Sequence, residues 1–155
     1  MSAPLNNDQS YQLGWLKKRS EFLHVRNGHY AARKTVVIQS RKAACTGPSR
    51  DAATAHISQN TKAGKKTKTK MGKHYDMRVG ITATKRIGNA VIRNRAKRRL
   101  RALARDCLPR FGQLGYDYVL IARDHTPHCE FSELKRDIEK ALKRLAQGHS
   151  QDAQI

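Results

Sequence analysis

The stretch from Lys85 to Arg105 contains nine Lys or Arg residues and no Asp or Glu. It follows a segment of alternating apolar and polar residues, and Asn89 stands where a helix cap is expected, so we predict a long helix from Asn89 to about Pro109. Exposed helix faces usually interleave charges of both signs, because like charges one turn apart repel by a few tenths of a kcal/mol. The sequence therefore predicts that a polyanion outside the chain balances this helix.

The predicted helix has an apolar face and a cationic face. At about 100° per residue, its apolar positions fall within roughly 80° of one another, and they are Ile92, Ala96, Leu100, Leu103 and Cys107. The opposite side carries Asn94, Arg98, Arg101 and Arg105, flanked by Arg93, Arg95 and Lys97. Guanidinium groups bind phosphate oxygens in pairs, and an Asn side chain can donate to or accept from a base or a ribose. This arrangement favours a phosphate-binding surface over a solvated helix face.

The overall charge supports the same conclusion. The chain has 155 residues, 32 Lys and Arg against 12 Asp and Glu, and a formal net charge of +20. An excess of this size opposes compaction unless a polyanion is bound, most often a nucleic acid or an anionic membrane surface. It is not typical of a neutral metabolic enzyme. With 38% hydrophobic residues, we expect one small core with basic appendages.

Other features of the sequence indicate a cytoplasmic protein. No run approaches the roughly 18 apolar residues of a membrane span, and the N-terminus lacks the pattern of a secretory signal. The three cysteines, Cys45, Cys107 and Cys129, are dispersed and odd in number, which is typical of a reducing compartment and not of a disulfide framework. We therefore expect no membrane association, and nothing in the sequence indicates an obligatory protein partner.

We expect one domain over residues 16–147, between a flexible N-terminal tail at 1–15 and a C-terminal tail at 148–155. Within the domain, residues 41–75 are expected to form a mobile basic insertion. This stretch is rich in Lys, Gly, Ser, Thr and Ala, and Ile57 is its single branched aliphatic residue. Such a segment buries too little apolar surface to offset the entropy lost on ordering.

Hydrophobic spacing predicts the remaining elements. Residues 20–28 are predicted to form a short amphipathic helix with Ser20 as its cap and Gly28 as its end. Residues 33–40, 77–84 and 116–123 have the β-branched or alternating pattern of strands. The final helix, which Gly148 is expected to end, buries Phe131, Leu134, Ile138, Leu142 and Leu145.

No residue set in the sequence predicts catalysis or metal binding by the chain itself. The 12 acidic residues are scattered, whereas metal-dependent phosphodiester cleavage needs clustered carboxylates. His125, His128 and Cys129 lack a second ligand pair at zinc-site spacing, so an ordinary loop is favoured. A Gly-Lys-Lys sequence is not a phosphate loop, because Gln59 and Lys66 stand where that loop requires Gly and Ser or Thr.

The segment KRIGNAVIRNRAKRRLR, from Lys85 to Arg101, resembles the signature of the bacterial ribonuclease P protein component. In that family a basic strand end leads through a Gly and an Ala-Val pair into R-N-x-x-K-R-x-x-R on a helix. The matching residues here are Lys85, Gly88, Ala90, Val91, Arg93, Asn94, Lys97, Arg98 and Arg101. The resemblance extends, in the family's order, from about Leu16 to Leu145 apart from the insertion.

The resemblance implies a single small α+β domain. Its expected element order is α-β-β-β-α-β-α, with a mixed four-stranded sheet and a left-handed crossover, as in a domain shared with some ribosomal proteins. Hydrophobic spacing predicts three of these strands. The resemblance implies a fourth, which would be a short strand between Gly28 and Ala32.

The resemblance also implies a function as the protein subunit of an endoribonuclease, ribonuclease P, in which a catalytic RNA carries the chemistry and holds most of the Mg²⁺. The protein would bind this RNA and the 5′ leader of precursor tRNA, and assist removal of the leader. No catalytic residue and no metal ligand is implied in this chain. The implied RNA-binding residues are Lys85, Arg86, Arg93, Asn94, Arg95, Lys97, Arg98, Arg101 and Arg105.

The leader would lie in a cleft between the first helix and the sheet. Phe22 matches the family's aromatic residue on that helix, whereas Arg26, Val36 and Gln39 stand where some members carry further aromatics. Stacking on an aromatic side chain contributes about 1 to 3 kcal/mol per base, so the leader contacts of this chain are expected to depend more on cations.

Two other functions are compatible with the basic composition. A ribosomal-type structural protein would share the fold and sediment with ribosomal particles without affecting tRNA maturation. A general DNA-binding protein would prefer duplex DNA to folded RNA in competition. Neither explains the ordered signature from Lys85 to Arg101, so ribonuclease P is the favoured interpretation.

Overall fold

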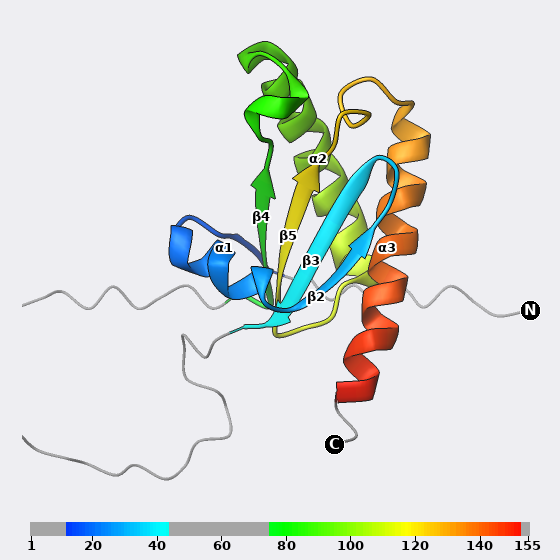
Figure 1. Cartoon of the computed structure of the whole chain (residues 1–155). Helices are drawn as coiled ribbons and strands as arrows, with labels where there is room; N and C mark the ends of the chain where they lie inside the picture. The colour runs from blue at the N-terminus through cyan, green and yellow to red at the C-terminus, as the bar shows by residue number, and fades with distance from the viewer. Residues whose placement is uncertain (1–11, 44–74, 153–155) are drawn as a thin grey trace, which may run out of the picture.

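The computed structural model describes residues 12–43 and 75–152. These residues form β1 (Leu13–Trp15), α1 (Arg19–Arg26), β2 (His29–Ala32), β3 (Val36–Lys42), β4 (Met77–Thr82), the 3-10 turn η1 (Lys85–Ile87), α2 (Ala90–Phe111), β5 (Tyr116–Ala122) and α3 (Phe131–Asp152). α1 covers part of one face of a single sheet, and α2 and α3 lie on the other face (Figure 1).

The strands form one five-stranded mixed sheet in the order β1-β4-β5-β3-β2. β1, β4 and β5 are parallel, and β3 is antiparallel to both β5 and β2. α2 connects the parallel neighbours β4 and β5 from behind the sheet, which gives the left-handed crossover expected from the resemblance (Figure 1). Most such connections are right-handed, because a twisted strand and a right-handed helix pack back onto a sheet more readily that way. The α+β class is confirmed, with five strands instead of four.

The main hydrophobic core lies between the sheet and the two long helices. The helices contribute Ala96, Leu100, Leu103, Ala104, Cys107 and Leu108 from α2, and Leu134, Ile138, Ala141, Leu142 and Leu145 from α3. The apolar stripes predicted for both helices are thus confirmed, with two exceptions. Ile92 is half-buried and Phe131 is exposed, because each lies in the first turn of its helix at the margin of the core.

β1 corrects the expectation that residues 1–15 form a flexible tail, since Leu13 to Trp15 pair with Met77 to Val79. The strand has three residues with Gly14 at its centre, so it contains no alternation from which a strand could be predicted. It forms because the edge of β4 offers unpaired backbone groups, a long-range contact that the local pattern does not contain. Residues 1–11 lie outside the described part of the chain.

The start of α1 also differs from the prediction. The helix begins at Arg19, so Ser20 lies inside it and is not its cap. Glu21 satisfies the backbone groups that precede the helix. Its Oε2 accepts hydrogen bonds from the N–H groups of Lys17 and Lys18, both at 2.9 Å.

α3 continues through Gly148, which the sequence predicts as its end. A Gly inside a helix costs about 1 kcal/mol relative to Ala, but the next residue, His149, is buried and holds the helix end against the sheet. His149 Nε2 lies 2.7 Å from Ser40 Oγ, its Nδ1 lies 2.7 Å from Gln113 Oε1, and its ring stacks on Tyr116. The expected C-terminal tail at 148–155 is therefore helical as far as Asp152, and residues 153–155 lie outside the described part.

The expected insertion at 41–75 falls mainly on residues 44–74, which the structure does not describe. Arg41 and Lys42 belong to β3, so the strand continues further than predicted. The two flanks of the segment meet at one residue, Gly115. The Ala43 N–H donates to the Gly115 carbonyl, and the Gly115 N–H donates to the Asp76 carbonyl, both at 2.8 Å. Among the helices of residues 12–43 and 75–152, none is long and apolar enough to cross a membrane.

Candidate RNA interface

The outer face of α2 presents cations without acidic partners. Asn89 caps the helix as the sequence predicts, its Oδ1 accepting a hydrogen bond from the Ile92 N–H at 3.0 Å. The side chains exposed along this face are Asn94, Arg95, Arg98, Arg101 and Arg105. In the part of the chain that the structure describes, no acidic side chain forms a salt bridge with a cation between Lys85 and Arg105. The charge of the outer face is thus available to an external anion.

The other predicted RNA-binding cations take different positions. Lys85 and Arg86 are exposed on η1, just before α2, and Lys97 is half-buried at the flank of the helix. Arg93 is also half-buried, and its Nη1 donates a hydrogen bond to the Gly88 carbonyl at 2.8 Å. Arg93 therefore fixes the turn that leads into α2, a structural role that the exposed arginines do not have.

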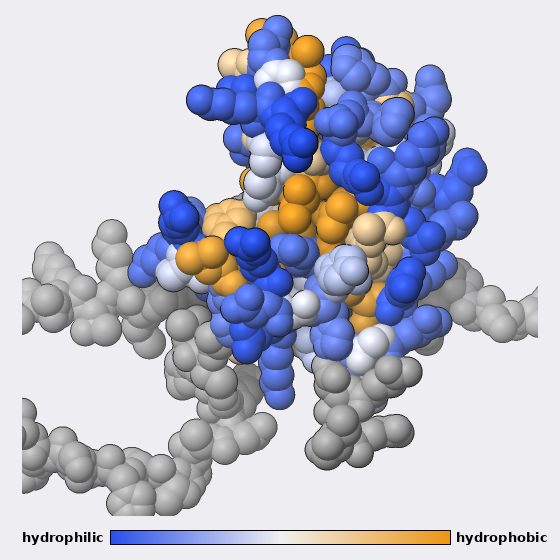
Figure 2. All heavy atoms as spheres, viewed as in Figure 1, coloured by the Kyte–Doolittle hydropathy of each residue, from blue (hydrophilic) through white to orange (hydrophobic). Residues whose placement is uncertain are grey.

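The sheet face that carries α1 is only partly covered. α1 packs on β3 and β5 around a small second core of Leu16, Val25 and Val119. Figure 2 shows an apolar surface beside α1, bordered by hydrophilic side chains. We call this surface the sheet cleft, and its half-buried residues are Phe22 from α1 with Val37, Gln39, Thr82 and Ile121 from the strands.

The family resemblance predicts that Phe22, Arg26, Val36 and Gln39 lie at the leader cleft. Phe22 packs over Gly80, where an added Cβ would lie 2.4 Å from the ring, and Arg26 is exposed one helical turn further along α1. Gln39 is half-buried on the same face of the sheet. The prediction for Val36 is wrong, because its side chain is fully buried in the main core on the opposite face.

Strand alternation explains the error at Val36. Ile38 is fully buried in the main core, and alternate residues of a strand share a face, so Val36 lies on that face and Val37 lies in the sheet cleft. The neighbouring strand β2 adds Tyr30, which is 70% exposed and pairs with Gln39 across the antiparallel ladder. Paired residues share a face, so an aromatic ring that the sequence did not predict lies on the same side as the sheet cleft.

α1 is held on the sheet by an ionic network centred on Arg78. The Nε and Nη2 groups of Arg78 donate to the two carboxylate oxygens of Asp117 at 2.8 and 2.6 Å, and its Nη1 donates to Glu21 Oε1 at 2.8 Å. Asp117 is 1% exposed, and a carboxylate buried to this degree needs a cationic partner. Arg78 therefore both neutralises Asp117 and links β4, β5 and α1. Because Phe22 follows Glu21 directly, the same network positions Phe22 over the sheet.

We expect the protein to lose stability in acid partly through Glu21. Partial burial acts to raise the pKa of this carboxyl, but the amides of Lys18 and Lys17 and the neighbouring Arg78 together lower the pKa below its ordinary value of 4.5. A lowered pKa contributes stability that is present above the ordinary value and is lost as the pH falls through the folded-state value. Urea unfolding from about pH 7 to about pH 3 should show a smaller loss of stability in Glu21→Gln than in the parent.

Glu130→Gln is the control for this measurement, since Glu130 is an exposed residue of the connection between β5 and α3. The control variant removes one carboxyl group but leaves the Arg78 network in place, so its loss of stability in acid should be larger than that of Glu21→Gln. An acid dependence in Glu21→Gln as steep as that of the control would contradict the contribution assigned to Glu21.

The described residues bring together no set of ligands for a metal ion. No group of three or more His, Cys, Asp or Glu side chains is placed to hold one within residues 12–43 and 75–152. The connection that contains His125, His128 and Cys129 is fixed by Arg99 instead, which donates to the carbonyls of Thr126 and Cys129. The Mg²⁺ implied by the resemblance therefore has no ligand cluster in this part of the chain.

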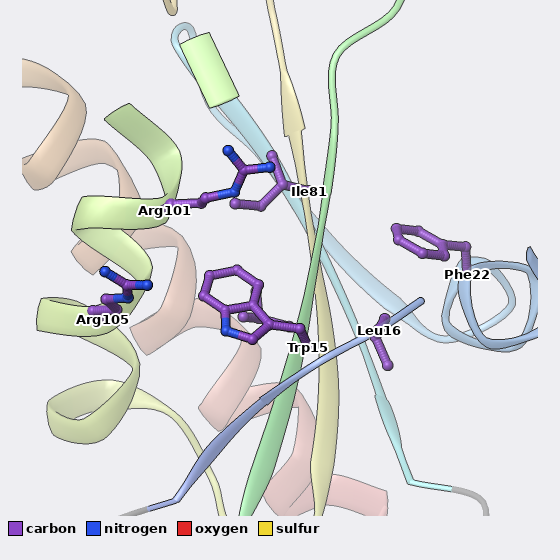
Figure 3. Close-up of a pocket in the computed structure, with 7 residues that line it drawn as sticks. Trp15, Leu16, Phe22, Ile81, Arg101 and Arg105 are labelled. Atoms are coloured by element: carbon purple, nitrogen blue, oxygen red, sulfur yellow. The ribbon is translucent and has the colours of Figure 1, made fainter. Parts of the chain in front are cut away.

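A notch at the edge of β4, beyond its pairing with β1, contains Trp15, an aromatic residue that the sequence analysis did not place in a site. The notch has a volume of about 380 Å³ and is lined by Trp15, Leu16, Phe22, Val79, Ile81, Arg101 and Arg105 (Figure 3). It joins the two surfaces described above, because Arg101 and Arg105 belong to the outer face of α2 and Phe22 borders the sheet cleft. Trp15 lies in the expected N-terminal tail. It is the single tryptophan of a basic chain, and this is the sequence signal that could have identified it as a site residue.

The amino-acid sequence is similar to proteins of one family. A family model described as Ribonuclease P matches residues 14–146. The ribonuclease P protein component of Ruegeria pomeroyi is 38% identical over 131 residues, which cover 84% of each chain. That of Caulobacter vibrioides is 54% identical over 70 residues, which cover 45% of this chain and 47% of the other.

The fold is also shared with solved structures. The solved structure of the RNase P protein of Staphylococcus aureus aligns with a TM-score of 0.57 and 21% identity, over 84% of this chain and 94% of that one. At this identity the likeness shows a shared fold. The sequence matches, which include the cationic segment of α2, show the family as well. The chain belongs to the ribonuclease P protein component family.

Proposed function

We propose that the chain is the protein subunit of the ribonuclease P ribonucleoprotein in the cytoplasm. It binds the catalytic RNA and the 5′ leader of precursor tRNA, and it assists endonucleolytic removal of the leader to give the mature 5′ end. The observation that carries the proposal is the adjacency of two surfaces, the outer face of α2 and the sheet cleft, which meet at the notch.

The outer face of α2 is suited to a folded RNA. Its arginines present forked donors that fit phosphate oxygens, and binding releases the counterions condensed on the RNA. Lys85 and Arg86 on η1 extend the same charge to the N-terminal end of α2. The free N–H groups and the dipole of a helix N-terminus also favour phosphate there.

The sheet cleft is suited to an unpaired strand. A single strand exposes the faces of its bases, which gain about 1 to 3 kcal/mol each by stacking on aromatic side chains. Phe22 and Tyr30 provide rings on this face of the sheet, and Val37 and Ile121 provide apolar surface. Arg26 adds a cation on α1. Aromatic contacts therefore contribute more to leader binding than the sequence alone indicates.

We assign the chemistry to the RNA subunit. Hydrolysis of a phosphodiester with Mg²⁺ requires hard oxygen ligands, which the described residues do not bring together and which RNA phosphates supply. The contribution of the protein is to reduce repulsion between the phosphate chains and to hold the leader in position. No residue of this chain is proposed to touch the scissile phosphate.

The proposal is tested by cleavage of a leader-bearing precursor tRNA by a bacterial ribonuclease P RNA at low Mg²⁺, with and without the protein. We expect strong stimulation, because the cations replace part of the Mg²⁺ that brings the two RNAs together. The double variant Arg95→Ala, Arg98→Ala should lose most of the stimulation. The double variant Arg136→Ala, Lys140→Ala removes the same charge from exposed positions of α3 and should retain it. No stimulation despite tight RNA binding would favour a ribosomal-type structural protein.

The single variant Arg98→Ala should weaken binding to the RNA subunit and reduce its salt dependence. Removing one phosphate-binding cation makes the slope of log K against log salt concentration shallower by about 0.7 to 0.9. Arg98 is exposed and forms no hydrogen bond or ion pair among the described residues, so folding stability should change little. Binding measured over a series of salt concentrations checks this, and an unchanged slope would remove Arg98 from the phosphate-binding surface.

A further inference from the structure

The notch at the edge of β4 exists because two parallel neighbours differ in length. β1 ends at Trp15, which pairs with Val79, whereas β4 continues to Thr82. The outer edge of β4 beyond Val79 is therefore not covered by the β1 ladder, and residues of α1 and α2 approach it from the two faces of the sheet (Figure 3). The volume of about 380 Å³ lies within the roughly 300 to 1,000 Å³ of small-molecule sites.

The side chains of the notch fit a ligand with a flat ring and a phosphate. Trp15 lies between the sheet and α2, is partly exposed, and has the Arg105 guanidinium 5.7 Å from its ring centroid. Arg101 stands one turn before Arg105 on the same helix. No acidic residue lines the notch. An indole face binds a base by stacking, and guanidinium groups bind phosphate.

A purely structural role does not account for both arginines. The contact with Trp15 can hold Arg105 against β1, but Arg101 has no ring contact with any described residue. Within the same part of the chain, neither guanidinium forms a hydrogen bond or an ion pair with a protein group. Two forked donors therefore remain available beside a partly exposed ring, in a hollow of the surface.

We propose that the notch binds one unpaired nucleotide of an RNA, with the base stacked on Trp15 and the phosphate held by Arg101 and Arg105. This site rests on the RNA-binding function proposed above and is separate from the sheet cleft. Trp15 packs at the margin of the main core on the α2 side, whereas Phe22 packs in the small core on the α1 side. A strand that passes from the sheet cleft to the outer face of α2 crosses the edge of β4 at this point.

Trp15 is the single tryptophan of the chain, so the intrinsic tryptophan fluorescence of the full-length protein reports on the notch alone. Three probes are titrated separately: a ribonuclease P RNA, a precursor tRNA with its leader, and the mature tRNA without it. A base stacked on the indole should quench the emission. Quenching by the precursor but not the mature tRNA identifies the leader as the source of the nucleotide, and quenching by the ribonuclease P RNA identifies that subunit. Tight binding of all three probes with unchanged emission would overturn the proposal.

Variants test whether the ring itself contributes to binding. Trp15→Leu should weaken binding of the quenching RNA about tenfold, as expected for the loss of one base stack, and Trp15→Phe should restore most of the affinity. Phe131→Leu is the matched control, because it also removes an exposed ring beside an arginine of α2, Arg99 at 5.8 Å, but lies outside the notch. Equal affinities of Trp15→Leu and Phe131→Leu would overturn the proposal.

Because Trp15→Leu also removes packing area from β1, a further test uses the parent protein. Single nucleotides of the quenching RNA are replaced in turn by abasic ones, and quenching should disappear at one position. Quenching that survives every replacement would exclude a nucleotide in the notch. If the protein binds RNA and stimulates cleavage of the precursor without any quenching, the nucleotide site in the notch is contradicted and the proposed function is not. If the protein binds no RNA, both the site and the proposed function are contradicted.

Discussion

Replacement of Arg78 by Met should lower the free energy of unfolding by about 3 to 5 kcal/mol, the largest effect that we expect from a single substitution. The variant leaves the Asp117 carboxylate buried without its two guanidinium hydrogen bonds, and it releases Glu21 from the sheet. Methionine retains much of the apolar volume of the arginine stem, so the loss reflects a buried charge without a partner. Urea unfolding followed by circular dichroism measures the change.

Lys34→Met is the matched control, because it removes an ion pair at the surface. Lys34 Nζ lies 3.9 Å from Glu133 Oε1, with the two side chains 68% and 42% exposed, and exposed pairs contribute about 0 to 1 kcal/mol. The double variant Arg78→Met, Asp117→Leu should recover part of the loss, because no buried charge remains. Equal destabilisation by Arg78→Met and Lys34→Met would show that the network does not anchor α1.

Leu103→Ala should cost about 2 to 5 kcal/mol of unfolding free energy. Leu103 is 1% exposed in the middle of the apolar face of α2. Truncation removes buried apolar surface and leaves a cavity that the closely packed core fills only in part. Arg98→Ala on the outer face is the comparison and should change stability by no more than about 0.5 kcal/mol. Similar losses in the two variants, measured by urea unfolding, would mean that α2 is rotated about its axis.

α2 illustrates which part of the fold could be predicted from the sequence. Its charged and apolar residues repeat with the helical period over several turns, and the cap at Asn89 is a local signal, so both faces and the start of the helix follow from the chain itself. β1 illustrates the opposite case. Three residues around Gly14 contain no periodic pattern, and the strand depends on pairing with β4, which is distant from it in the sequence.

In the candidate site, too, local patterns predict some features, and others depend on long-range pairing. The cations of α2 follow from helical spacing, but the choice between Val36 and Val37 requires the register, which the ladder with β5 sets by pairing Val37 with Ile121. Tyr30 reaches the open face only through its pairing with Gln39. The carboxylates that bind Arg78 are 39 and 57 positions away from it in the sequence, so no local pattern predicts the network that positions α1.

The backbone of Gly115 joins the flanks of residues 44–74, since it accepts a hydrogen bond from Ala43 and donates one to Asp76. Backbone hydrogen bonds therefore hold both flanks next to the start of β5, so the pairing of β3 and β4 with β5 extends to the two ends of this segment. The entropic cost of closing a loop rises slowly, by about 0.6 kcal/mol for each doubling of its length. We therefore expect a change in the number of residues between these flanks, such as an inserted label, to leave unchanged the strand register that supports the outer face of α2 and the sheet cleft.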